Sequence, residues 1–384
     1  MRVLHTNIGI YPERGGPPAV IVNLAAAQAR AGHHVTIASA RTHSDLLNIQ
    51  RRMLSRVDGG HLVSVAEVDP LSMWRCLFGS IENLPGGPAD IIHIHEIWNP
   101  FDSYVARVAR SSTTPYVVTV HGLLSPIRCR HRRLKKWLAR TLFVNRLLER
   151  ALFVQGLTAS ECDDIRGLVP TAVVRQVPNG YSAVSATNAL VQPPHQCHLL
   201  QDQPFILFMS RLHPMKGIDL LVPAFERVAT SNPALRLVIA GPDDGGLNSL
   251  NLAIASSTVR ERIHVIGMVD GPTKAWLLSN AAVFVLPSRD EGFSIAILEA
   301  LSSGIPTVIS PECHFPEAAA AGAAIEVALD PQAIADAVLL LLANQELHSR
   351  MSSAGLQLVR QHYTWDRIAA LLLDLYVNSP RTRQ

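Results

Sequence analysis

The 384-residue chain is short of cysteine, of aromatic residues and of charge. Its five cysteines are scattered and never spaced as Cys-x-x-Cys, so neither a disulfide framework nor a cysteine-based zinc site organises the fold. Charged residues make up 17% and apolar residues 48% of the chain, which is typical of a well-buried globular protein rather than a disordered one. A reducing, cytoplasmic setting suits these free thiols.

Long hydrophobic runs and a dinucleotide fingerprint are also missing. No run of about eighteen uncharged apolar residues occurs, so we predict no membrane-spanning helix. The first residues lack the apolar stretch and small-residue cleavage site of a signal peptide. No Gly-x-Gly-x-x-Gly occurs, so nothing supports a dinucleotide cofactor, and a net charge of +3 does not argue for nucleic acid as a partner. We expect a cytoplasmic protein, at most peripheral on the inner face of the plasma membrane.

What is present is a regular alternation of short apolar runs with longer helical patterns, which predicts parallel sheets covered by helices. The predicted strands of the first half are Val3–Gly9, His34–Ser39, Leu62–Val68, Ile91–His95, Tyr116–His121, Leu152–Thr158 and Ala172–Val177. Those of the second half are Phe205–Ser210, Leu235–Ala240, Ile263–Val269, Ala282–Pro287, Pro306–Ser310 and Ala324–Ala328. Predicted helices include Pro18–Ala31, Leu220–Thr230, Thr273–Asn280 and Ile295–Ser303.

A polar segment without periodicity separates the two halves, and 384 residues exceed what one hydrophobic core usually holds. We therefore predict an α/β fold of two doubly wound, Rossmann-like domains: residues 1–185, a linker at 186–203, and residues 204–364. Ligands of such sheets bind beyond the carboxyl ends of the strands, so the residues that follow each strand are the candidates for a site.

Two basic residues follow the first strand of the second half. Arg211 and Lys216 lie in the strand-to-helix loop, where a guanidinium and an ammonium together suit a diphosphate. An exposed loop with ordinary solvated charges is the alternative interpretation of this feature taken alone.

A second loop of the same half, between Ala282–Pro287 and Ile295–Ser303, adds an anion site. Gly292 permits a tight turn and Ser294 is a candidate helix cap, so the N–H groups of Phe293, Ser294 and Ile295 face the ligand crevice. Glu291 precedes this site and Glu299 follows it, which suits one carboxylate on each side of a bound diphosphate. The alternative is that Glu299 is a buried, paired residue and Glu291 a solvated cap.

These motifs resemble those of family 4 glycosyltransferases (glycosyl transferases group 1), which have the GT-B fold. The resemblance rests on Glu291-x7-Glu299, on the loop with Arg211 and Lys216, and on the Gly241-Pro242-Asp243 turn. It implies two Rossmann-like domains with parallel sheets facing a central cleft, and a C-terminal helix at about 365–384 that completes the first domain. It further implies that Arg211 and Lys216 bind the donor diphosphate, with Glu291 on the transferred sugar and Glu299 on the ribose.

In the first half, the candidate residues of the acceptor side are harder to identify from the sequence. Gly15 and Gly16 open a helix, and the resemblance implies that this loop faces acceptor and donor phosphates; a tight strand-to-helix turn is the alternative. His121 follows a strand, at the place where the family has a histidine beside the donor sugar, and is the catalytic candidate of this half. Glu96 and Asp102 are candidate acceptor contacts. His93 and His95, within a strand, are interpreted as packing or polar-network residues.

One cluster of basic residues stands out. A helical stripe of Leu134, Trp137, Leu138, Thr141 and Leu142 leaves basic residues over the remaining faces. This pattern fits a helix lying on anionic lipid, and a stripe packed on its own domain is the alternative. The proposed membrane patch consists of Arg132, Arg133, Lys135, Lys136, Trp137 and Arg140.

The resemblance implies a retaining hexosyltransferase that takes a UDP- or GDP-sugar and passes the sugar to a hydroxyl of a glycan or lipid-linked acceptor, as in bacterial exopolysaccharide or lipopolysaccharide synthesis. No Asp-x-Asp motif occurs, since Asp243 and Asp244 are adjacent, so neither a metal ion nor a cofactor is expected. A sugar-nucleotide epimerase of the same fold and a non-catalytic protein that binds membranes or polyanions are the alternatives.

Overall fold

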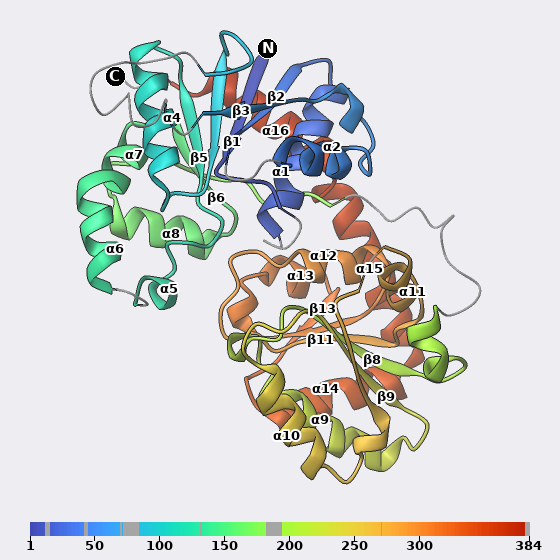
Figure 1. Cartoon of the computed structure of the whole chain (residues 1–384). Helices are drawn as coiled ribbons and strands as arrows, with labels where there is room; N and C mark the ends of the chain where they lie inside the picture. The colour runs from blue at the N-terminus through green and yellow to red at the C-terminus, as the bar shows by residue number, and fades with distance from the viewer. Residues whose placement is uncertain are drawn as a thin grey trace. The chain divides into compact units, whose positions relative to one another are not determined.

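The computed structural model describes residues 1–11, 16–41, 45–69, 71, 84–130, 133–181, 194–269 and 271–380, and the statements below concern these residues. The chain divides into two compact units, which are described one at a time (Figure 1). The first comprises Met1–Gly180 together with Trp365–Gln384, and the second comprises Tyr181–Thr364.

The first unit is built on a parallel sheet of seven strands in the order β3-β2-β1-β4-β5-β6-β7. The strands are β1 (Arg2–Asn7), β2 (His34–Ala40), β3 (Ser64–Val68), β4 (Ile91–His95), β5 (Tyr116–Thr119), β6 (Phe153–Gly156) and β7 (Val174–Gln176). The helices include α1 (Gly16–Arg30), α2 (Leu46–Leu54), α4 (Pro100–Ser111), α5 (Pro126–Arg130), α6 (Arg133–Ala139), the π-helical η3 (Arg140–Val144), α7 (Asn145–Glu149), α8 (Ala159–Leu168) and α16 (Trp365–Asn378).

The second unit has a parallel sheet of six strands in the order β10-β9-β8-β11-β12-β13. The strands are β8 (Phe205–Met209), β9 (Arg236–Ala240), β10 (Ile263–Gly267), β11 (Val283–Leu286), β12 (Thr307–Ile309) and β13 (Ala324–Glu326). The helices include η5 (His195–Leu200), η6 (Pro214–Lys216), α9 (Ile218–Ser231), α10 (Leu247–Ser256), α11 (Gly271–Asn280), α12 (Ile295–Ser302), α13 (Pro316–Ala320), α14 (Pro331–Ala343) and α15 (Gln345–His362).

Burial on both faces explains why the strands read as continuous apolar runs. All five residues of β8 and all four of β11 are buried, because helices cover both sides of a parallel sheet. Each of the thirteen predicted strands occurs, with bounds within two residues of the prediction. The fold of two Rossmann-like domains is therefore confirmed.

The prediction for the segment between the units is wrong at its C-terminal end. The linker was predicted at 186–203, but η5 lies within it, and its Cys197 and Leu200 are buried in the core of the second unit. Apolar residues in so short a run give no periodic signal, so the sequence pattern did not reveal this helix. Residues 182–193 of the predicted linker lie outside the described residues.

In each sheet the strand order reverses at one point, between β1 and β4 in the first and between β8 and β11 in the second. Neighbouring loops diverge to opposite faces at such a point and leave room for a ligand beyond the carboxyl ends of the strands. Each unit thus offers one place for a site. Among the described residues, no helix combines the length and the apolarity needed to cross a bilayer.

Candidate active site

In the second unit, the loop after β8 approaches the carboxyl end of β11 closely. Gly217, between η6 and α9, has a φ of 69°, and a Cβ there would lie 1.9 Å from the Pro287 carbonyl oxygen, so only glycine fits. Arg289 of the second loop donates two hydrogen bonds, of 2.7 and 2.8 Å, to the carboxylate of Asp219 at the start of α9. These contacts hold the two predicted loops against each other.

The structure joins Lys216 to Glu291, which were predicted as separate donor contacts. Lys216 Nζ lies 2.6 Å from Glu291 Oε1, and the two side chains are only 7% and 9% exposed. Glu291 is therefore not a solvated cap. An ammonium carries three N–H donors. In the described part of the chain, Glu291 is the acceptor paired with the Lys216 ammonium. Lys216 can thus donate to a diphosphate while it stays paired.

Glu299 has a partner that the sequence analysis missed. Lys274 Nζ, from α11, lies 2.6 Å from Glu299 Oε1, and the Glu299 side chain is 11% exposed against 32% for Lys274. The interpretation of Glu299 as a buried, paired residue is thus correct as far as the free protein goes. The pair does not exclude a ligand contact, because Lys274 is the more exposed member and keeps two N–H donors for other acceptors.

Helix α12 begins between these two ion pairs, and its start differs in detail from the prediction. Ser294 occupies the N-cap position but makes no side-chain cap hydrogen bond, and Gly292 is not among the glycines of positive φ in the described chain. Ser294 is thus the N-cap residue, without a side-chain cap hydrogen bond, and the chain bends at Gly292 without a positive φ. Phe293 turns onto the rings of Phe315 and Tyr363, at centroid distances of 5.6 and 6.1 Å. Within the described residues, the N–H groups of Phe293, Ser294 and Ile295 donate no hydrogen bond, so they can bind an anion, which the helix dipole favours.

Arg211 is exposed, unlike Lys216, Glu291 and Glu299. Its guanidinium donates to the Asp244 carboxylate, with side chains 50% and 41% exposed. Exposed ion pairs of this kind contribute little to stability, so the guanidinium can exchange its partner for a phosphate at small cost. Gly241 is sterically required beside it, since a Cβ would lie 1.8 Å from the Ser210 carbonyl oxygen.

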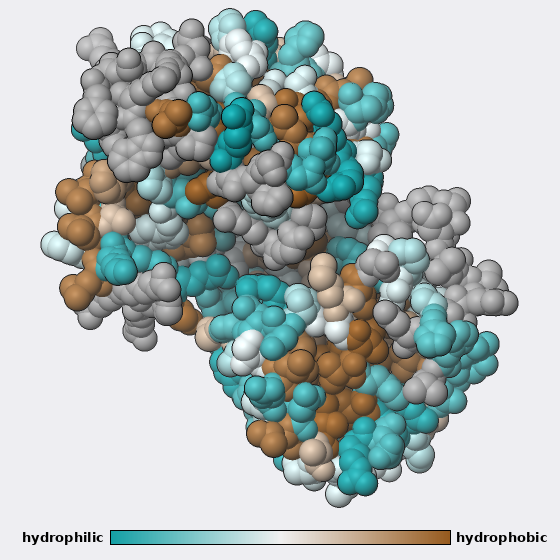
Figure 2. Space-filling model, in the orientation of Figure 1, coloured by the Kyte–Doolittle hydropathy of each residue, from teal (hydrophilic) through white to brown (hydrophobic). Residues whose placement is uncertain are grey.

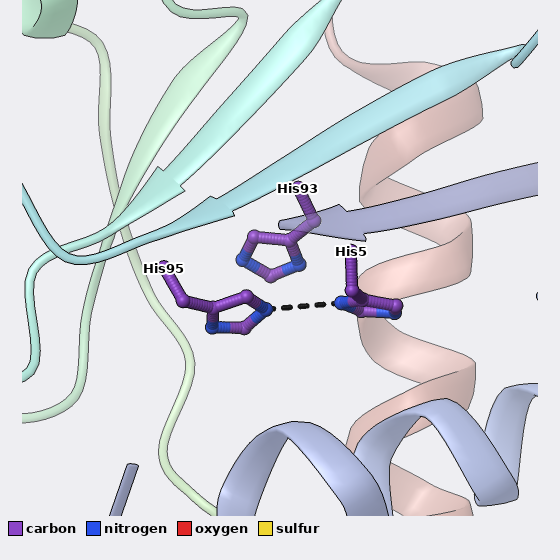
Figure 3. Close-up of side chains that lie close together, drawn as sticks. All are labelled: His5, His93 and His95. Carbon is purple, nitrogen blue, oxygen red and sulfur yellow. Dashed lines mark hydrogen bonds between the residues drawn. The ribbon is translucent and has the colours of Figure 1, made fainter. Parts of the chain in front are cut away.

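In the first unit, a row of polar side chains crosses the sheet on one face. The register pairs His5 of β1 with His93 of β4, and Thr119 of β5 with both His95 of β4 and Gln155 of β6. Side chains of residues that pair or lie two apart point to the same face, so the register alone gathers this row. Figure 3 shows the rings of His5, His93 and His95 close together.

Every ring nitrogen of these three histidines has a hydrogen-bond partner. His5 contacts His95 at 2.9 Å and Gln28 of α1 at 2.7 Å, and His93 contacts Tyr376 of α16 and Thr119, each at 2.6 Å. The second nitrogen of His95 lies 3.1 Å from His121 Nε2. Burial lowers the pKa of His5 to about 4 and the pKa values of His93 and His95 well below 6.5, so the rings are neutral near pH 7. The polar-network interpretation of His93 and His95 is confirmed.

His121 stands at the end of this row, in a strained turn. It follows β5 with a φ of 51°, and Gly122 has a φ of 75°. Positive φ in a non-glycine residue is costly and often marks a functional site. Glu161, which the sequence analysis missed, accepts the Gly122 N–H with one carboxylate oxygen and the Leu157 N–H, at 2.5 Å, with the other. Glu161 therefore fixes the turn that carries His121.

The two predicted acceptor contacts of the first unit differ. Glu96 follows β4 with a φ of 86° and accepts a 3.0 Å hydrogen bond from Asn99 Nδ2. Asp102 is fully buried and closes the capping box of α4 by accepting from the Asn99 N–H. The structure therefore corrects the expectation for Asp102, since a buried cap cannot reach an acceptor.

Of the two glycines predicted before α1, Gly15 lies outside the described residues, and Gly16 is the exposed first residue of the helix. A Cβ on Gly16 would meet nothing within 4 Å in the described chain. Space at this position therefore gives no reason for glycine.

The basic segment forms α5, α6, η3 and α7, and its apolar stripe faces outward. Leu134 is 82% exposed, and Trp137, Leu138, Leu142 and Phe143 are each more than half exposed. Figure 2 shows hydrophobic atoms gathered at the edge of the molecule that carries α6. The alternative of a stripe packed on its own domain is therefore wrong.

The basic members of the predicted patch are less uniform. Lys135 is exposed, whereas Lys136 folds back, donating to the Arg128 carbonyl at 2.7 Å and lying 5.1 Å from the Trp98 ring centroid. Arg140 is half-buried. Lys136 and Arg140 are therefore poor candidates for direct lipid contact. Arg132 and the side chain of Arg133 lie outside the described residues.

Comparison with known proteins covers both units. Residues 15–180 match the family model "Glycosyl transferase 4-like domain", and residues 195–358 match "Glycosyl transferases group 1". The GDP-mannose:cellobiosyl-diphosphopolyprenol alpha-mannosyltransferase of Xanthomonas campestris is 25% identical over 100% of this chain and 99% of its own length. The phosphatidyl-myo-inositol mannosyltransferase of Mycobacterium tuberculosis is 26% identical over 94% of this chain and 93% of its own.

Solved structures agree on the fold. The Anabaena protein HepE in complex with UDP and glucose superposes with a TM-score of 0.74 at 15% identity, covering 97% of this chain and 98% of its own. WaaG, a glycosyltransferase involved in lipopolysaccharide biosynthesis, gives a TM-score of 0.67 at 16% identity, covering 98% of this chain and 100% of its own. With two Rossmann-like units and family models that match both of them, the chain belongs to the GT4-type glycosyltransferases of the GT-B fold.

Proposed function

We propose that this glycosyltransferase moves a hexose, with mannose as the first candidate, from a UDP- or GDP-sugar to a hydroxyl of a lipid-linked glycan, with retention at the anomeric carbon and without a metal ion. The observation that carries the proposal is the arrangement around α12, where a free helix N-terminus lies between the Lys216–Glu291 and Lys274–Glu299 pairs. Bacterial exopolysaccharide or lipopolysaccharide synthesis is the proposed setting.

The donor half supports departure of a nucleoside diphosphate. Negative charge grows on the diphosphate as its bond to the sugar breaks, and groups already in place stabilise that charge best. Arg211, Lys216 and the first-turn amides of α12 supply this stabilisation here. Asp243 accepts three backbone N–H groups of residues 245–247 and Asp244 pairs with Arg211, so both adjacent carboxylates serve protein partners.

We propose that the two carboxylates of the pairs contact the donor. Lys216 and Lys274 each engage one oxygen, Oε1, of their glutamate, which leaves the other oxygen to accept a hydroxyl hydrogen bond. We assign Glu291 to hydroxyls of the transferred sugar and Glu299 to the ribose. Each glutamate is paired with a lysine and is assigned here to donor hydroxyls, so we propose that the acceptor hydroxyl itself attacks on the face that the diphosphate leaves.

Two observations favour a lipid-linked acceptor. The Xanthomonas relative is named for a diphosphopolyprenol acceptor and the mycobacterial relative for a phosphatidylinositol, and both are mannosyltransferases. The exposed apolar stripe of α6 and η3 offers a surface that could rest on the membrane in which such an acceptor lies.

The test begins with the donor. GDP-mannose, UDP-glucose, GDP and UDP are screened for thermal stabilisation, because a bound donor raises the melting temperature by mass action. The stabilising sugar nucleotide is then incubated with glycosylated polyprenyl diphosphates in the presence of a chelator, and the anomeric configuration of the product is read by NMR. Transfer with the donor's own α configuration is expected. Inversion, loss of activity with the chelator, or an epimerised sugar nucleotide without acceptor would each contradict the corresponding part of the proposal.

A further inference from the structure

The polar row of the first unit is a candidate for more than packing. The ring nitrogens of His5, His93 and His95 lie within 4.8 Å of one another, close enough to share a metal ion. All six of these nitrogens already have protein partners, however, so a metal would have to displace hydrogen bonds that are in place. The direction of those hydrogen bonds carries more information than the proximity of the rings.

The donor and acceptor of each hydrogen bond in the row can be assigned starting from Gln155. Its Nε2 donates a 2.8 Å hydrogen bond to the Val177 carbonyl, so its Oε1, which can only accept, faces Thr119. Thr119 Oγ1 lies 2.7 Å from that oxygen and must donate its single proton to it. His93 Nε2 lies 2.6 Å from the same hydroxyl, so His93 must carry a proton on Nε2.

The Tyr376 hydroxyl links His93 of the sheet to Gln28 of α1, so it extends the assignment of donors and acceptors to α1. Because neutral His93 is protonated on Nε2, its Nδ1 accepts, and Tyr376 donates to it at 2.6 Å. The tyrosine has then used its proton and can only accept, which requires the amide nitrogen of Gln28 at 3.4 Å. Gln28 Oε1 is therefore the atom that faces His5 Nε2 at 2.7 Å, and His5 carries its proton on Nε2.

Along the remaining rings, each histidine accepts at Nδ1 a hydrogen bond from Nε2–H of the next. His5 Nδ1 accepts from His95 Nε2 at 2.9 Å, and His95 Nδ1 accepts from His121 Nε2 at 3.1 Å. In the described residues, Nδ1 of His121 has no hydrogen-bond partner. His121, with Asn179 and Trp365, lines a small pocket beside the row. The series thus ends on a lone pair at the edge of the sheet.

We infer that this directed series of hydrogen bonds, from the Val177 carbonyl through Tyr376 to His121, holds His121 in the Nε2–H tautomer and presents Nδ1 as an acceptor to a hydroxyl of a sugar bound beside the sheet of the first unit. Thr119, Gln155, Gln28 and Tyr376 are positioning residues in this scheme, because they act on the substrate through His121. The part that concerns the sugar rests on the proposed function, whereas the tautomer does not.

Two features make the arrangement suited to this task. His121 has its pKa lowered to about 4 by burial, so the ring stays neutral and its lone pair stays available near pH 7. If the Gln28 amide were turned the other way, His5, His95 and His121 would each carry the proton on Nδ1 instead of Nε2. His121 Nδ1 would then be a hydrogen-bond donor and not an acceptor. The Tyr376 hydroxyl is the group that distinguishes the two orientations, since it binds His93 and Gln28 together.

The test reads the tautomers directly. The full-length protein is labelled with 15N-histidine, and two-bond 1H–15N correlation spectra distinguish Nδ1–H from Nε2–H rings without any substrate. His5, His93, His95 and His121 are assigned by single His→Asn variants. All four rings are expected as Nε2–H tautomers. An Nδ1–H tautomer for His121, or a shift of the His5, His93 and His95 signals on addition of zinc alone, would overturn the inference.

The matched variants are Tyr376→Phe and Tyr116→Phe. Each removes one buried tyrosine hydroxyl of the first unit, but that of Tyr116 donates to the Leu147 carbonyl at 2.9 Å, outside the series. Tyr376→Phe is expected to give a mixture of tautomers at His121. It is also expected to lower kcat/KM about tenfold, which corresponds to the net contribution of one hydrogen bond. The affinity for free UDP or GDP is expected to stay unchanged. Tyr116→Phe is expected to change neither tautomer nor kcat/KM.

The outcomes separate this inference from the proposed function. If the wild-type rings are all Nε2–H but no sugar is transferred, the series stands and the proposed function fails. If transfer occurs and Tyr376→Phe leaves both the His121 tautomer and kcat/KM as in the wild type, the positioning role of Tyr376 is refuted. Should Tyr376→Phe fold poorly, the wild-type spectrum alone still decides the tautomer.

Discussion

The two lysine–glutamate pairs of the second unit differ in burial, and this difference governs what each contributes to stability. Lys216 and Glu291 are 7% and 9% exposed, whereas Lys274 is 32% exposed beside Glu299. Removing one member of a buried pair leaves a charge that water cannot reach, and the cost is far greater than for a pair at the surface. Stability is therefore expected to fall more at Lys216 than at Lys274.

Lys216→Met is expected to lower the free energy of unfolding of the second unit by about 3 kcal/mol, because Glu291 then loses its partner in a buried site. Lys274→Met is expected to cost only about 1 kcal/mol, because solvent screens the more exposed pair. Both variants are expected to weaken binding of the stabilising sugar nucleotide at least tenfold, since each loses a cation of the proposed donor site.

Urea unfolding and isothermal titration with the sugar nucleotide measure the two effects. Arg260→Ala is the control, because its ion pair with Glu261 is largely exposed at 63% and 87% and lies away from α12. It is expected to change neither quantity. If Lys216→Met bound the nucleotide as well as the wild type while losing stability, the pair would be structural only.

The candidate donor residues could be named from the sequence, and their pairing could not. Arg211, Lys216, Glu291 and Glu299 follow strands at fixed spacing, so local sequence identifies them. Lys274 lies 25 residues before Glu299, on a different helix, and nothing in its own neighbourhood marks it. The role of Asp102 was mistaken for a different reason: its partner Asn99 is only three residues away, but a carboxylate at this spacing suits a helix cap and a ligand contact equally.

At the scale of elements, the segment from α5 to α7 is the least typical part of the first unit. Its middle is a π-helix, Arg140–Val144, and large apolar side chains on both sides of the junction with α6 are exposed. An interrupted helical repeat changes the face on which successive side chains emerge. It therefore helps to spread Trp137, Leu142 and Phe143 over one outward surface.

Leu138→Glu with Leu142→Glu is expected to weaken binding to vesicles that contain phosphatidylglycerol about tenfold, because two apolar contacts are replaced by repelled charges. The side chains are 52% and 56% exposed, so the melting temperature should change little. Vesicle co-sedimentation measures the binding. Leu252→Glu is the control, as Leu252 is 74% exposed on α10 of the second unit. Equal binding by all three proteins would contradict a membrane role for this surface.

Elements were predicted well where burial dictates the sequence. Strands of a parallel sheet are apolar on both faces, so β8 and β11 could be read directly. The polar row was visible only in pieces, because His5, Thr119 and Gln155 come from three strands and their meeting depends on the register. The outward face of α6 could not be predicted either, since the same stripe would suit a buried interface.

At the scale of the whole molecule, the two units should respond differently to acid. Burial lowers the pKa values of His5 and His121 to about 4, and those of His93 and His95 well below 6.5. The unfolded chain then binds more protons than the folded one between pH 6.5 and pH 4, so stability falls as the pH falls through this range. Each ring with a pKa of about 4 accounts for about 3 kcal/mol at most.

Glu161 opposes this trend. Burial raises its pKa to about 7, above the unfolded value of 4.5, so its contribution falls as the pH rises from 4.5 through 7. Burial also raises the pKa of Asp102 well above its usual value, so this carboxyl acts in the same direction as Glu161. Four imidazoles outweigh these two carboxyls, and the first unit should lose stability on going from pH 7 to pH 5. Hydrogen exchange in urea at pH 7 and pH 5, corrected for the intrinsic exchange rate, measures the stability of each unit on its own peptides. The second unit then serves as the internal control. An equal loss in both units would contradict this prediction.

The helix that carries Tyr376 has a further consequence, for the order in which the molecule is made. The first unit consists of Met1–Gly180 and Trp365–Gln384, whereas the second is one continuous stretch. A ribosome therefore completes every residue of the second unit before it begins α16. Until then His93 lacks its tyrosine and the sheet lacks one covering helix, so the imidazoles stay open to water. The unit that is started first is the one that is finished last.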